Sequence, residues 1–222
     1  PEAVRARAVI LASNGFGNNR ALVERYIPEI AGAQYFGALG SDGEAMLWGE
    51  ELGAGLLNMA AYQGYAAVAD PHGSILSWTT IEKGGVLLND KGERFGDESL
   101  GYSGYAKHVL AEGARSWAVF DQRIFDIAMQ EEEFAELWHH KGLKKGDTVA
   151  EVAAAQGLDP VAAEAAVAAY NAAAAKGAPG VVAGLTGRDL RDDGSGGVPC
   201  GAPVGNRDGT DMKNPTRYCL AV

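Results

Sequence analysis

The sequence predicts an α+β fold, and three observations support this prediction. Helical and strand-like patterns follow one another irregularly along the 222 residues, without the regular strand–helix–strand order of a parallel sheet. Hydrophobic residues make up 47% of the chain and charged residues 22%, which is typical of a globular protein with a buried core. The glycine-rich fingerprint G-x-G-x-x-G is absent, because GSGGVPCG at 194–201 has Pro199 in place of the third glycine.

The first 55 residues predict one strand and two short helices, each with a local start or stop signal. Asn18 or Asn19 can cap the first helix, and Pro28 stops it. Gly53 closes the second helix. The expected elements are a strand at 9–12, a tight turn at 13–17, a helix from 19 to 26, and a helix at 44–52 capped by Ser41 or Asp42.

Between residues 56 and 95 the pattern predicts strands. Apolar residues recur in a strand-like way from 56 to 88, with breaks at 70–73 and 82–84. The run GGVLLNDKGERF at 84–95 predicts a strand, a polar turn and a returning strand.

Helices dominate the rest of the chain. Residues 184–217 are rich in Gly, Asp, Pro and Asn and predict a long loop. The expected elements are a helix at 102–110, a strand at 117–120, a helix capped by Asp121, a helix at 131–138, a helix from Asp147 to Gly157, a helix at 161–176 with Pro160 in its first turn, and a strand at 218–222.

Composition excludes several classes of function. The formal net charge of -10 argues against nucleic acid as a partner, since phosphate binding needs clustered Lys and Arg. No run approaches the ~18 apolar residues of a membrane helix. Cys200 and Cys219 show no C-x-x-C spacing, which favours a reduced, cytoplasmic protein. The adjacent His139 and His140 would point ~100° apart on a helix, so no metal is expected there.

Three phrases carry a family resemblance. They are ASNGF at 12–16, SDG at 41–43 and GGVLLNDKGERFGDE at 84–98. In this order they resemble ATGGF-x-x-N, GDG-x-x-x-A and GGI-x-VN-x-x-G-x-RF-x-NE of the flavoprotein subunits of fumarate reductases and succinate dehydrogenases. That family includes, in its broad sense, the 3-ketosteroid dehydrogenases. The match covers residues 8 to about 125 well, and the helical stretch up to 177 more loosely.

The resemblance implies a piece of a larger protein. In that family a capping domain interrupts the FAD-binding domain, whose glycine-rich fingerprint lies upstream of ATGGF. It implies three parts here: residues 1–55 as a residual FAD-domain segment, 56–183 as the capping domain, and 184–222 as a loop and strand returning toward the missing FAD domain. The strand-like runs near both ends of the sequence agree with this interpretation.

FAD is the cofactor that the resemblance implies for the full-length parent. Carried over by position, Ala12, Ser13 and Gly15 would lie along FAD, and Ser41 with Asp42 would lie near the flavin. Asn14 departs from the glycine of the family at this point. Without the upstream fingerprint, the 222 residues alone are not expected to retain FAD.

Three departures from the dicarboxylate enzymes bear on the substrate, two between residues 63 and 78 and one at Tyr102. Two residues after Gln63 this chain has Tyr65 where those enzymes have His. Ser77 and Trp78 occupy roughly the sequence positions of the Thr-Glu pair in those enzymes. Planar cationic groups bind carboxylates well, and none of these residues is cationic. Tyr65, Ser77 and Trp78 therefore favour a small apolar substrate that bears a carbonyl.

The segment FGDESLGYSGYAKHV at 95–109 holds the main catalytic candidate. Tyr102, four residues past Glu98, stands where those enzymes have a proton-donating Arg, and it resembles the N-E-x-x-x-Y of the 3-ketosteroid dehydrogenases. There a tyrosine exchanges a proton with a substrate carbon while flavin exchanges hydride. The alternative is that Tyr102 is a packed ring at a helix start.

These residues together predict a fragment of an FAD-dependent oxidoreductase acting on a C–C bond next to a carbonyl, itself inactive. Two alternatives stay open. One is a short-acid reductase of the fumarate or succinate type. The other is a non-enzymatic binding domain that keeps the capping fold.

Overall fold

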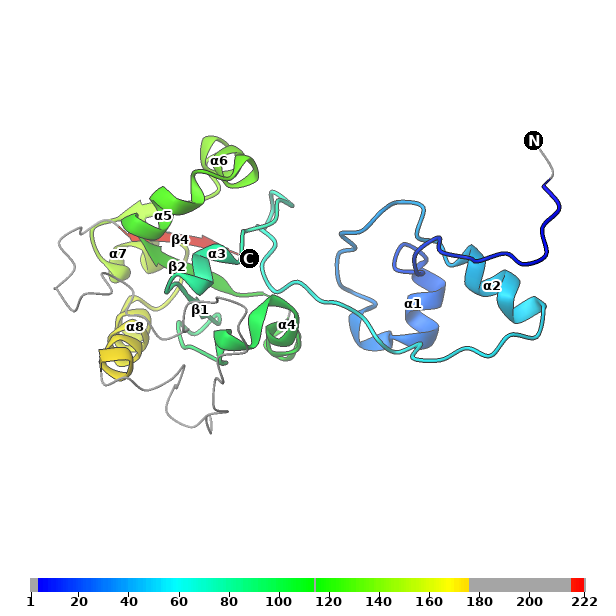
Figure 1. Ribbon diagram of the computed structural model, residues 1–222. Helices are drawn as coiled ribbons and strands as arrows, with labels where there is room; N and C mark the ends of the chain where they lie inside the picture. Colours follow the sequence, from blue (N-terminus) through cyan, green and yellow to red (C-terminus); the bar gives the residue numbers. More distant parts are fainter. Residues whose placement is uncertain (1–3, 114, 176–216, 222) are drawn as a thin grey trace. The chain divides into compact units, whose positions relative to one another are not determined.

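The computed structural model describes residues 4–113, 115–175 and, as backbone only, 217–221. The chain divides into two compact units, residues 1–63 and 64–222 (Figure 1). Each unit is described by itself below. Residues 184–216 of the predicted loop and the end of the predicted helix at 176 lie outside the described residues, while Arg217 belongs to a strand. In the described part of the chain, no helix is long and apolar enough to cross a membrane.

The first unit contains three short helical elements: α1 (Arg20–Tyr26), the 3₁₀ helix η1 (Pro28–Ile30) and α2 (Glu44–Glu51). Asn19 caps α1, since its side chain accepts a hydrogen bond from the backbone N–H of Leu22. This confirms the predicted cap and helix. Gly53, with φ of 83°, closes α2 as predicted.

Two predictions in the first unit are wrong. The residue at the N-cap position of α2 is Gly43 in a left-handed conformation, without a side-chain bond, because Asp42 instead accepts from Asn18. The predicted strand at 9–12 is extended chain without strand pairing, and Val9 and Ile10 are 75% and 91% exposed. A strand is held by hydrogen bonds to a neighbouring strand, and the described residues of this unit offer none.

The second unit is built on a four-stranded antiparallel sheet in the order β1-β2-β4-β3. Its strands are β1 (Val86–Leu88), β2 (Trp117–Asp121), β3 (Lys144–Gly146) and β4 (Arg217–Ala221). Its helical elements are α3 (Thr79–Glu82), η2 (Glu98–Leu100), α4 (Gly101–Ala111), α5 (Gln122–Ala128), α6 (Glu132–His139), α7 (Val149–Ala155) and α8 (Pro160–Ala175). The predicted last strand is confirmed, and it pairs between β2 and β3 rather than at an edge.

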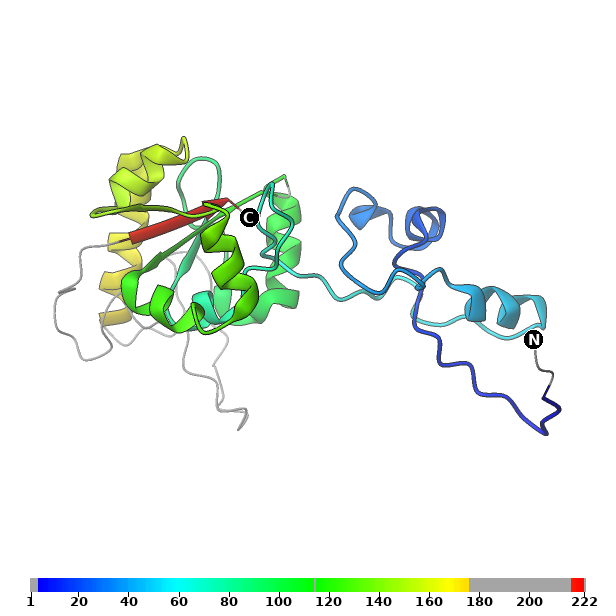
Figure 2. The same cartoon turned by 90° about the horizontal axis from the view of Figure 1, so that it is seen from above.

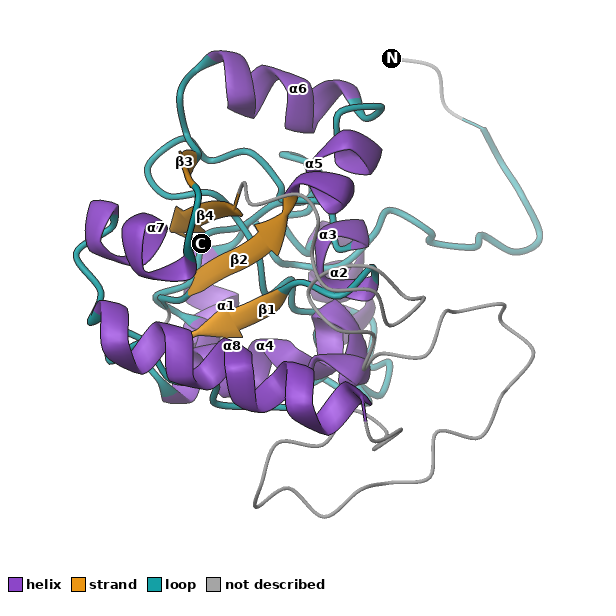
Figure 3. Ribbon diagram, turned by 90° about the vertical axis from the view of Figure 1, so that its left-hand side faces the viewer, coloured by secondary structure: helices purple, strands orange, loops and turns teal. Residues whose placement is uncertain are grey.

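Helices cover both faces of this sheet. Leu87, Ala118 and Phe120 belong to a core with residues of α3, α4, α5 and α6. Val86, Leu88 and Val119 belong to a second core with α7 and α8. Side chains alternate across a strand, so both faces of β1 and β2 are buried and their sequences read as unbroken apolar runs. Figures 2 and 3 show α7 and α8 on one side of the sheet and α5 on the other.

The local signals around these helices explain their limits. Asp121 caps α5 by accepting from the N–H of Ile124 at 3.0 Å, and Pro160 begins α8, both as predicted. At α7 the predicted cap is wrong. Thr148 caps the helix, while the Asp147 N–H donates to Glu151.

The strands predicted between 56 and 78 are wrong. This stretch is irregular chain with one isolated bridge, between Val68 and Ile75, around the predicted break at 70–73. Its buried residues, such as Ala67 and Leu76, pack against the core of α4 and α5. The predicted hairpin is confirmed in β1 and in its turn, but the return is a single bridge between Leu88 and Arg94.

Candidate functional site

Tyrosine and tryptophan rings gather at the start of α4 in the second unit. The rings of Tyr65 and Tyr102 stack with centroids 4.9 Å apart and an interplanar angle of 28°. Trp78 meets Tyr102 edge-on at 6.4 Å. Tyr65 and Trp78 come from the irregular segment before α3, and Tyr102 is the second residue of α4. The structure thus brings together three of the four residues predicted for proton transfer and substrate binding.

Both hydrogen-bonding functions of the Tyr65 hydroxyl are engaged by backbone. It donates to the carbonyl of Leu76 at 3.0 Å and accepts from the N–H of Trp78 at 3.1 Å. Burial raises the pKa of the Tyr65 phenol, so it stays protonated and keeps donating at neutral pH. Tyr65 therefore fixes the position of Trp78 and presents its ring, rather than its hydroxyl, to Tyr102.

Ser77 shapes the same turn. Its Oγ accepts from the N–H of Thr79 at 3.2 Å, and its carbonyl accepts from the hydroxyl of Thr80 at 2.8 Å. A serine hydroxyl that accepts one bond still has its own O–H to donate. Ser77 is half-buried and directly precedes the buried Trp78. It can therefore both begin α3 and offer one donor at this position.

Tyr105 is a member of the cluster that sequence reasoning did not include. It lies one turn after Tyr102, is 0% exposed, and packs against Trp78, Phe95 and His108 with centroids 6.1, 5.3 and 5.5 Å apart. An added Cβ at Gly96 would lie 2.6 Å from its ring. Its spacing of three from Tyr102 was the available signal, since such residues share a helix face.

The Tyr105 hydroxyl has no hydrogen-bond partner among the described residues. Burial, together with the nearby charge of Glu98, raises the pKa of Tyr105. The folded state therefore keeps this proton when the unfolded chain, with a phenol pKa of ~10, loses it. Stability from this group is fully present below pH ~10 and is lost as pH rises beyond it.

Tyr105→Phe should leave the free energy of unfolding at pH ~7 unchanged or raise it by about 1 kcal/mol, because no hydrogen bond is lost. Above pH ~10 the variant should lose less stability per pH unit than the wild type, by up to ~1.4 kcal/mol. Urea unfolding at two pH values measures both effects. A loss above ~2 kcal/mol at neutral pH would mean that the hydroxyl has a partner.

A buried ion pair lies under the start of α4. Arg94 Nε donates to Glu98 Oε1 at 3.0 Å, and a second guanidinium nitrogen contacts Oε2. The same Oε1 accepts from the N–H of Leu87. Although burial opposes the charged form, the hydrogen bond and charge of Glu98 raise the pKa of Arg94. Arg94 and Glu98 therefore pair with each other, and Glu98 also anchors β1 through the N–H of Leu87.

The residues predicted to contact FAD lie in the first unit. Ala12, Ser13 and Gly15 are exposed, and a Cβ placed at Gly15 would meet nothing within 4 Å. Asn14 has a φ of 71°, a left-handed conformation that asparagine tolerates better than most residues, which explains how it replaces glycine.

Asparagine side chains tie this segment to the loop before α2. Asn14 donates to the Ser41 hydroxyl at 2.8 Å, Asn18 donates to Asp42 Oδ1 at 2.8 Å, and Asn19 donates to the Asp42 carbonyl at 3.0 Å. Ser41 is 2% exposed, so it supports the loop from inside. The two predicted cofactor segments are thus held together, with the open backbone of 12–15 accessible to a ligand. This accessible backbone fits a segment that contacts a cofactor.

No group of three His, Cys, Asp or Glu side chains that could hold a metal occurs among the described residues. His139 is the last residue of α6 and His140 follows it, both exposed.

Comparison with known proteins identifies the class of protein. Residues 1–189 match the FAD binding domain family. A probable fumarate reductase of Shewanella frigidimarina is 26% identical over 175 residues, covering 78% of this chain and 29% of that protein. A 3-oxosteroid 1-dehydrogenase of Mycobacterium tuberculosis is 30% identical over 202 residues, covering 80% of this chain and 35% of that protein.

Solved structures agree in fold. The open conformation of a flavocytochrome c3 fumarate reductase superposes with a TM-score of 0.65 at 22% identity, covering 97% of this chain and 34% of that one. The 3-ketosteroid Δ4-(5α)-dehydrogenase of Rhodococcus jostii, in complex with 4-androstene-3,17-dione, superposes with a TM-score of 0.57 at 23% identity. The match covers 97% of this chain and 40% of that one.

The chain therefore belongs to the FAD binding domain family. It belongs to the family that includes the fumarate reductases and the 3-ketosteroid dehydrogenases, as the sequence motifs predicted. Members of this family are FAD-dependent oxidoreductases that act on C–C bonds, and FAD is the cofactor of the parent proteins. The chain spans about a third of the length of the two curated relatives described above.

Proposed function

We propose that this chain supplies the substrate-facing part of an FAD-dependent oxidoreductase that reduces or dehydrogenates a C–C bond next to a carbonyl of an apolar substrate. Residues 56–183 would form the capping domain, residues 1–55 part of the FAD domain, and residues 184–222 the return to it. The observation that carries the proposal is the stack of Tyr65 on Tyr102, edged by Trp78. Aromatic walls of this kind bind apolar ring systems.

Tyr102 is the residue we assign to proton transfer. It is half-buried at the first turn of an 11-residue helix, beside the rings of Tyr65 and Trp78. A hydrogen on the carbon next to a carbonyl is acidic, since its loss leaves charge that the carbonyl oxygen shares. In dehydrogenation Tyr102 takes that proton, and in reduction it returns it.

FAD, when bound, supplies the hydride acceptor or donor of this reaction. The exposed backbone at Ala12, Ser13 and Gly15 would hold it, together with Asp42, while Ser41 supports the loop. Ser77 would donate its remaining O–H to the substrate carbonyl, and Tyr65 and Trp78 would line the substrate.

The described arginines of the second unit support this substrate over a dicarboxylate. Its three arginines with described side chains each have another contact. Arg94 pairs with buried Glu98, Arg115 contacts Asp70 at 3.3 Å, and Arg123 donates to the Lys83 carbonyl at 2.8 Å. A dicarboxylate site needs cationic groups directed at both carboxylates, and these guanidinium groups are used elsewhere.

The relatives offer both kinds of substrate for comparison. One matched structure is a fumarate reductase, and two are 3-ketosteroid dehydrogenases in complex with steroid diones. The aromatic cluster leads us to place this protein with the second group. A short-acid reductase is the second candidate, because a probable fumarate reductase matches over 175 residues, compared with 202 for the 3-oxosteroid 1-dehydrogenase.

Substrate choice tests the proposal. The full-length flavoenzyme should turn over a neutral 3-ketosteroid or its unsaturated counterpart, with kcat/KM at least ~10²-fold above that for succinate or fumarate. Preference for the dicarboxylates would establish the second candidate. A full-length protein that purifies without flavin absorbance at ~450 nm, relative to a known flavoprotein control, would establish a binding domain instead. The 222-residue chain alone should elute from gel filtration without that absorbance, since the pyrophosphate-binding fingerprint is not in its sequence.

A further inference from the structure

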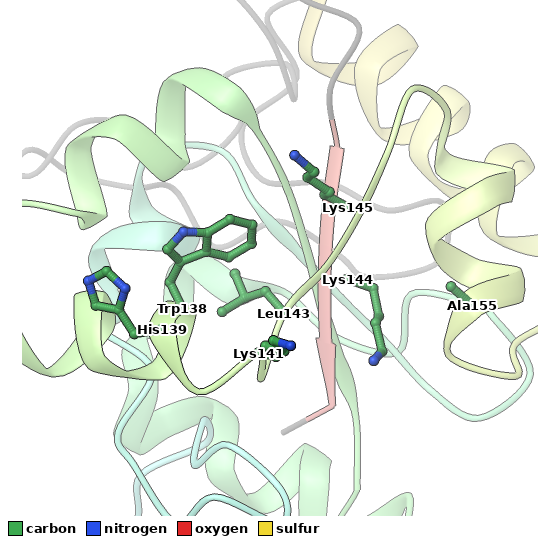
Figure 4. A pocket seen from close by; sticks show the side chains of 7 residues that line it. All are labelled: Trp138, His139, Lys141, Leu143, Lys144, Lys145 and Ala155. Atoms are coloured by element: carbon green, nitrogen blue, oxygen red, sulfur yellow. The ribbon is translucent and has the colours of Figure 1, made fainter.

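A shallow hollow beside β3 carries an arrangement that the oxidoreductase function does not use. It encloses about 560 Å³, within the range of small-ligand sites. Trp138 and His139 from the end of α6 line it, followed by Lys141, Leu143, Lys144 and Lys145. Figure 4 shows the lysine side chains and the Trp138 indole arranged around the segment that leads from α6 into β3.

The lining is cationic on a protein that is acidic as a whole. The formal net charge of the chain is -10, yet the described residues that line the hollow include three lysines and a histidine and no Asp or Glu. None of the three lysines forms an ion pair with an acid in the described ranges, and all three are exposed. Unpaired like charges that line one hollow repel one another, and a bound anion relieves that repulsion.

An aromatic wall accompanies the charges. The Trp138 indole is half-buried and packs edge-on against Phe125, with ring centroids 5.0 Å apart. Lys145 Nζ lies 6.0 Å from the indole centroid. Leu143 supplies a buried apolar side chain. A planar group could therefore lie against Trp138 while negative groups reach the lysines.

We propose that this hollow binds a polyanionic ligand with a planar ring, of the nucleoside diphosphate class. Lysine binds phosphate as a point charge, and the indole provides stacking surface for a base. The proposal is independent of the oxidoreductase function, because it uses none of the residues assigned to that function.

Edge-strand protection is the competing explanation for Lys144 and Lys145. β3 lies at the edge of the sheet, and lysines on an edge strand discourage pairing with another chain. That role requires neither Lys141 nor Trp138, and it predicts self-association rather than loss of ligand when the lysines are replaced.

Calorimetric titration of the 222-residue protein with ADP at ~50 mM salt tests the proposal. Wild type should bind ADP at least ~10-fold more tightly than adenosine. The double variant Lys144→Gln/Lys145→Gln should weaken ADP binding at least ~10-fold, since two charge contacts are removed. Lys91→Gln/Lys107→Gln removes two exposed lysines elsewhere and should leave ADP binding within ~2-fold. Trp138→Leu should weaken ADP binding ~5-fold or more and leave pyrophosphate binding unchanged.

Other outcomes would overturn the proposal. The first is a wild-type protein that is folded by circular dichroism and binds no ADP up to ~1 mM. The second is an equal loss of ADP affinity in the Lys144→Gln/Lys145→Gln and Lys91→Gln/Lys107→Gln variants. The third is binding of a glutamate-rich peptide without binding of ADP. Self-association of the Lys144→Gln/Lys145→Gln variant with unchanged ADP binding would assign these lysines to edge protection.

Discussion

Replacing Glu98 with alanine should lower the free energy of unfolding by about 3–5 kcal/mol, because the substitution leaves the buried charge of Arg94 without its partner. The side chains of Arg94 and Glu98 are 3% and 5% exposed, so water cannot replace the lost contact. The substitution also removes the acceptor for the Leu87 N–H, in the middle of β1. Urea unfolding of the 222-residue chain measures the loss.

A second variant separates the unpaired charge from the lost volume. Arg94→Met/Glu98→Leu removes both charges and keeps apolar bulk, so it should recover much of the stability lost in the single variant. The Arg94 guanidinium lies 4.3 Å from the Tyr170 ring centroid, and methionine can keep contact with that ring. A loss below ~1 kcal/mol in Glu98→Ala would show that the pair is solvated and does not hold α4 in place.

Tyr102→Phe in the full-length flavoenzyme should reduce kcat by ~10²–10⁴, the usual contribution of a positioned proton-transfer group. The stack on Tyr65 involves the rings, which phenylalanine retains, so flavin content and thermal stability should change little. Tyr105→Phe is the matched control. It is the same substitution one turn along α4, and its hydroxyl is buried, so turnover should stay within ~3-fold. Equal turnover in both variants would assign Tyr102 to packing alone.

Three helices of this protein begin where local sequence signals predict. Asn19, Asp121 and Pro160 mark the starts of α1, α5 and α8, and each acts within one turn of the helix that it begins. Such signals need no tertiary contact, so they can be read from the sequence alone.

The strand predictions failed where pairing decides the structure. Apolar residues at 65–78 recur in short strand-like runs, yet they are buried by packing against helices along an irregular path. The run at 9–12 has strand-forming residues and no described partner strand. Periodicity reports burial, while a strand also requires a neighbour with free backbone groups. The central place of β4, paired with β2 across about a hundred residues, is likewise a long-range outcome.

The candidate site was also predictable only in part from the sequence. Tyr65, Trp78 and Tyr102 were expected in one place from the family resemblance, and the structure joins them in one aromatic cluster. Tyr105 was missed because its spacing of three from Tyr102 indicates a shared helix face without showing that this face is buried. The engagement of the Tyr65 hydroxyl by backbone depends on the fold of the 76–78 turn, which the sequence did not predict.

Exchange of the substrate proton tests the central claim most directly. The full-length enzyme, with its ketone substrate in D₂O, should incorporate deuterium at the carbon next to the carbonyl. Mass spectrometry follows this step without net turnover. We predict that Tyr102→Phe slows incorporation at least ~10²-fold with the flavin still bound, while Tyr105→Phe exchanges at the wild-type rate. Wild-type exchange in Tyr102→Phe would contradict the assignment of proton transfer to this residue.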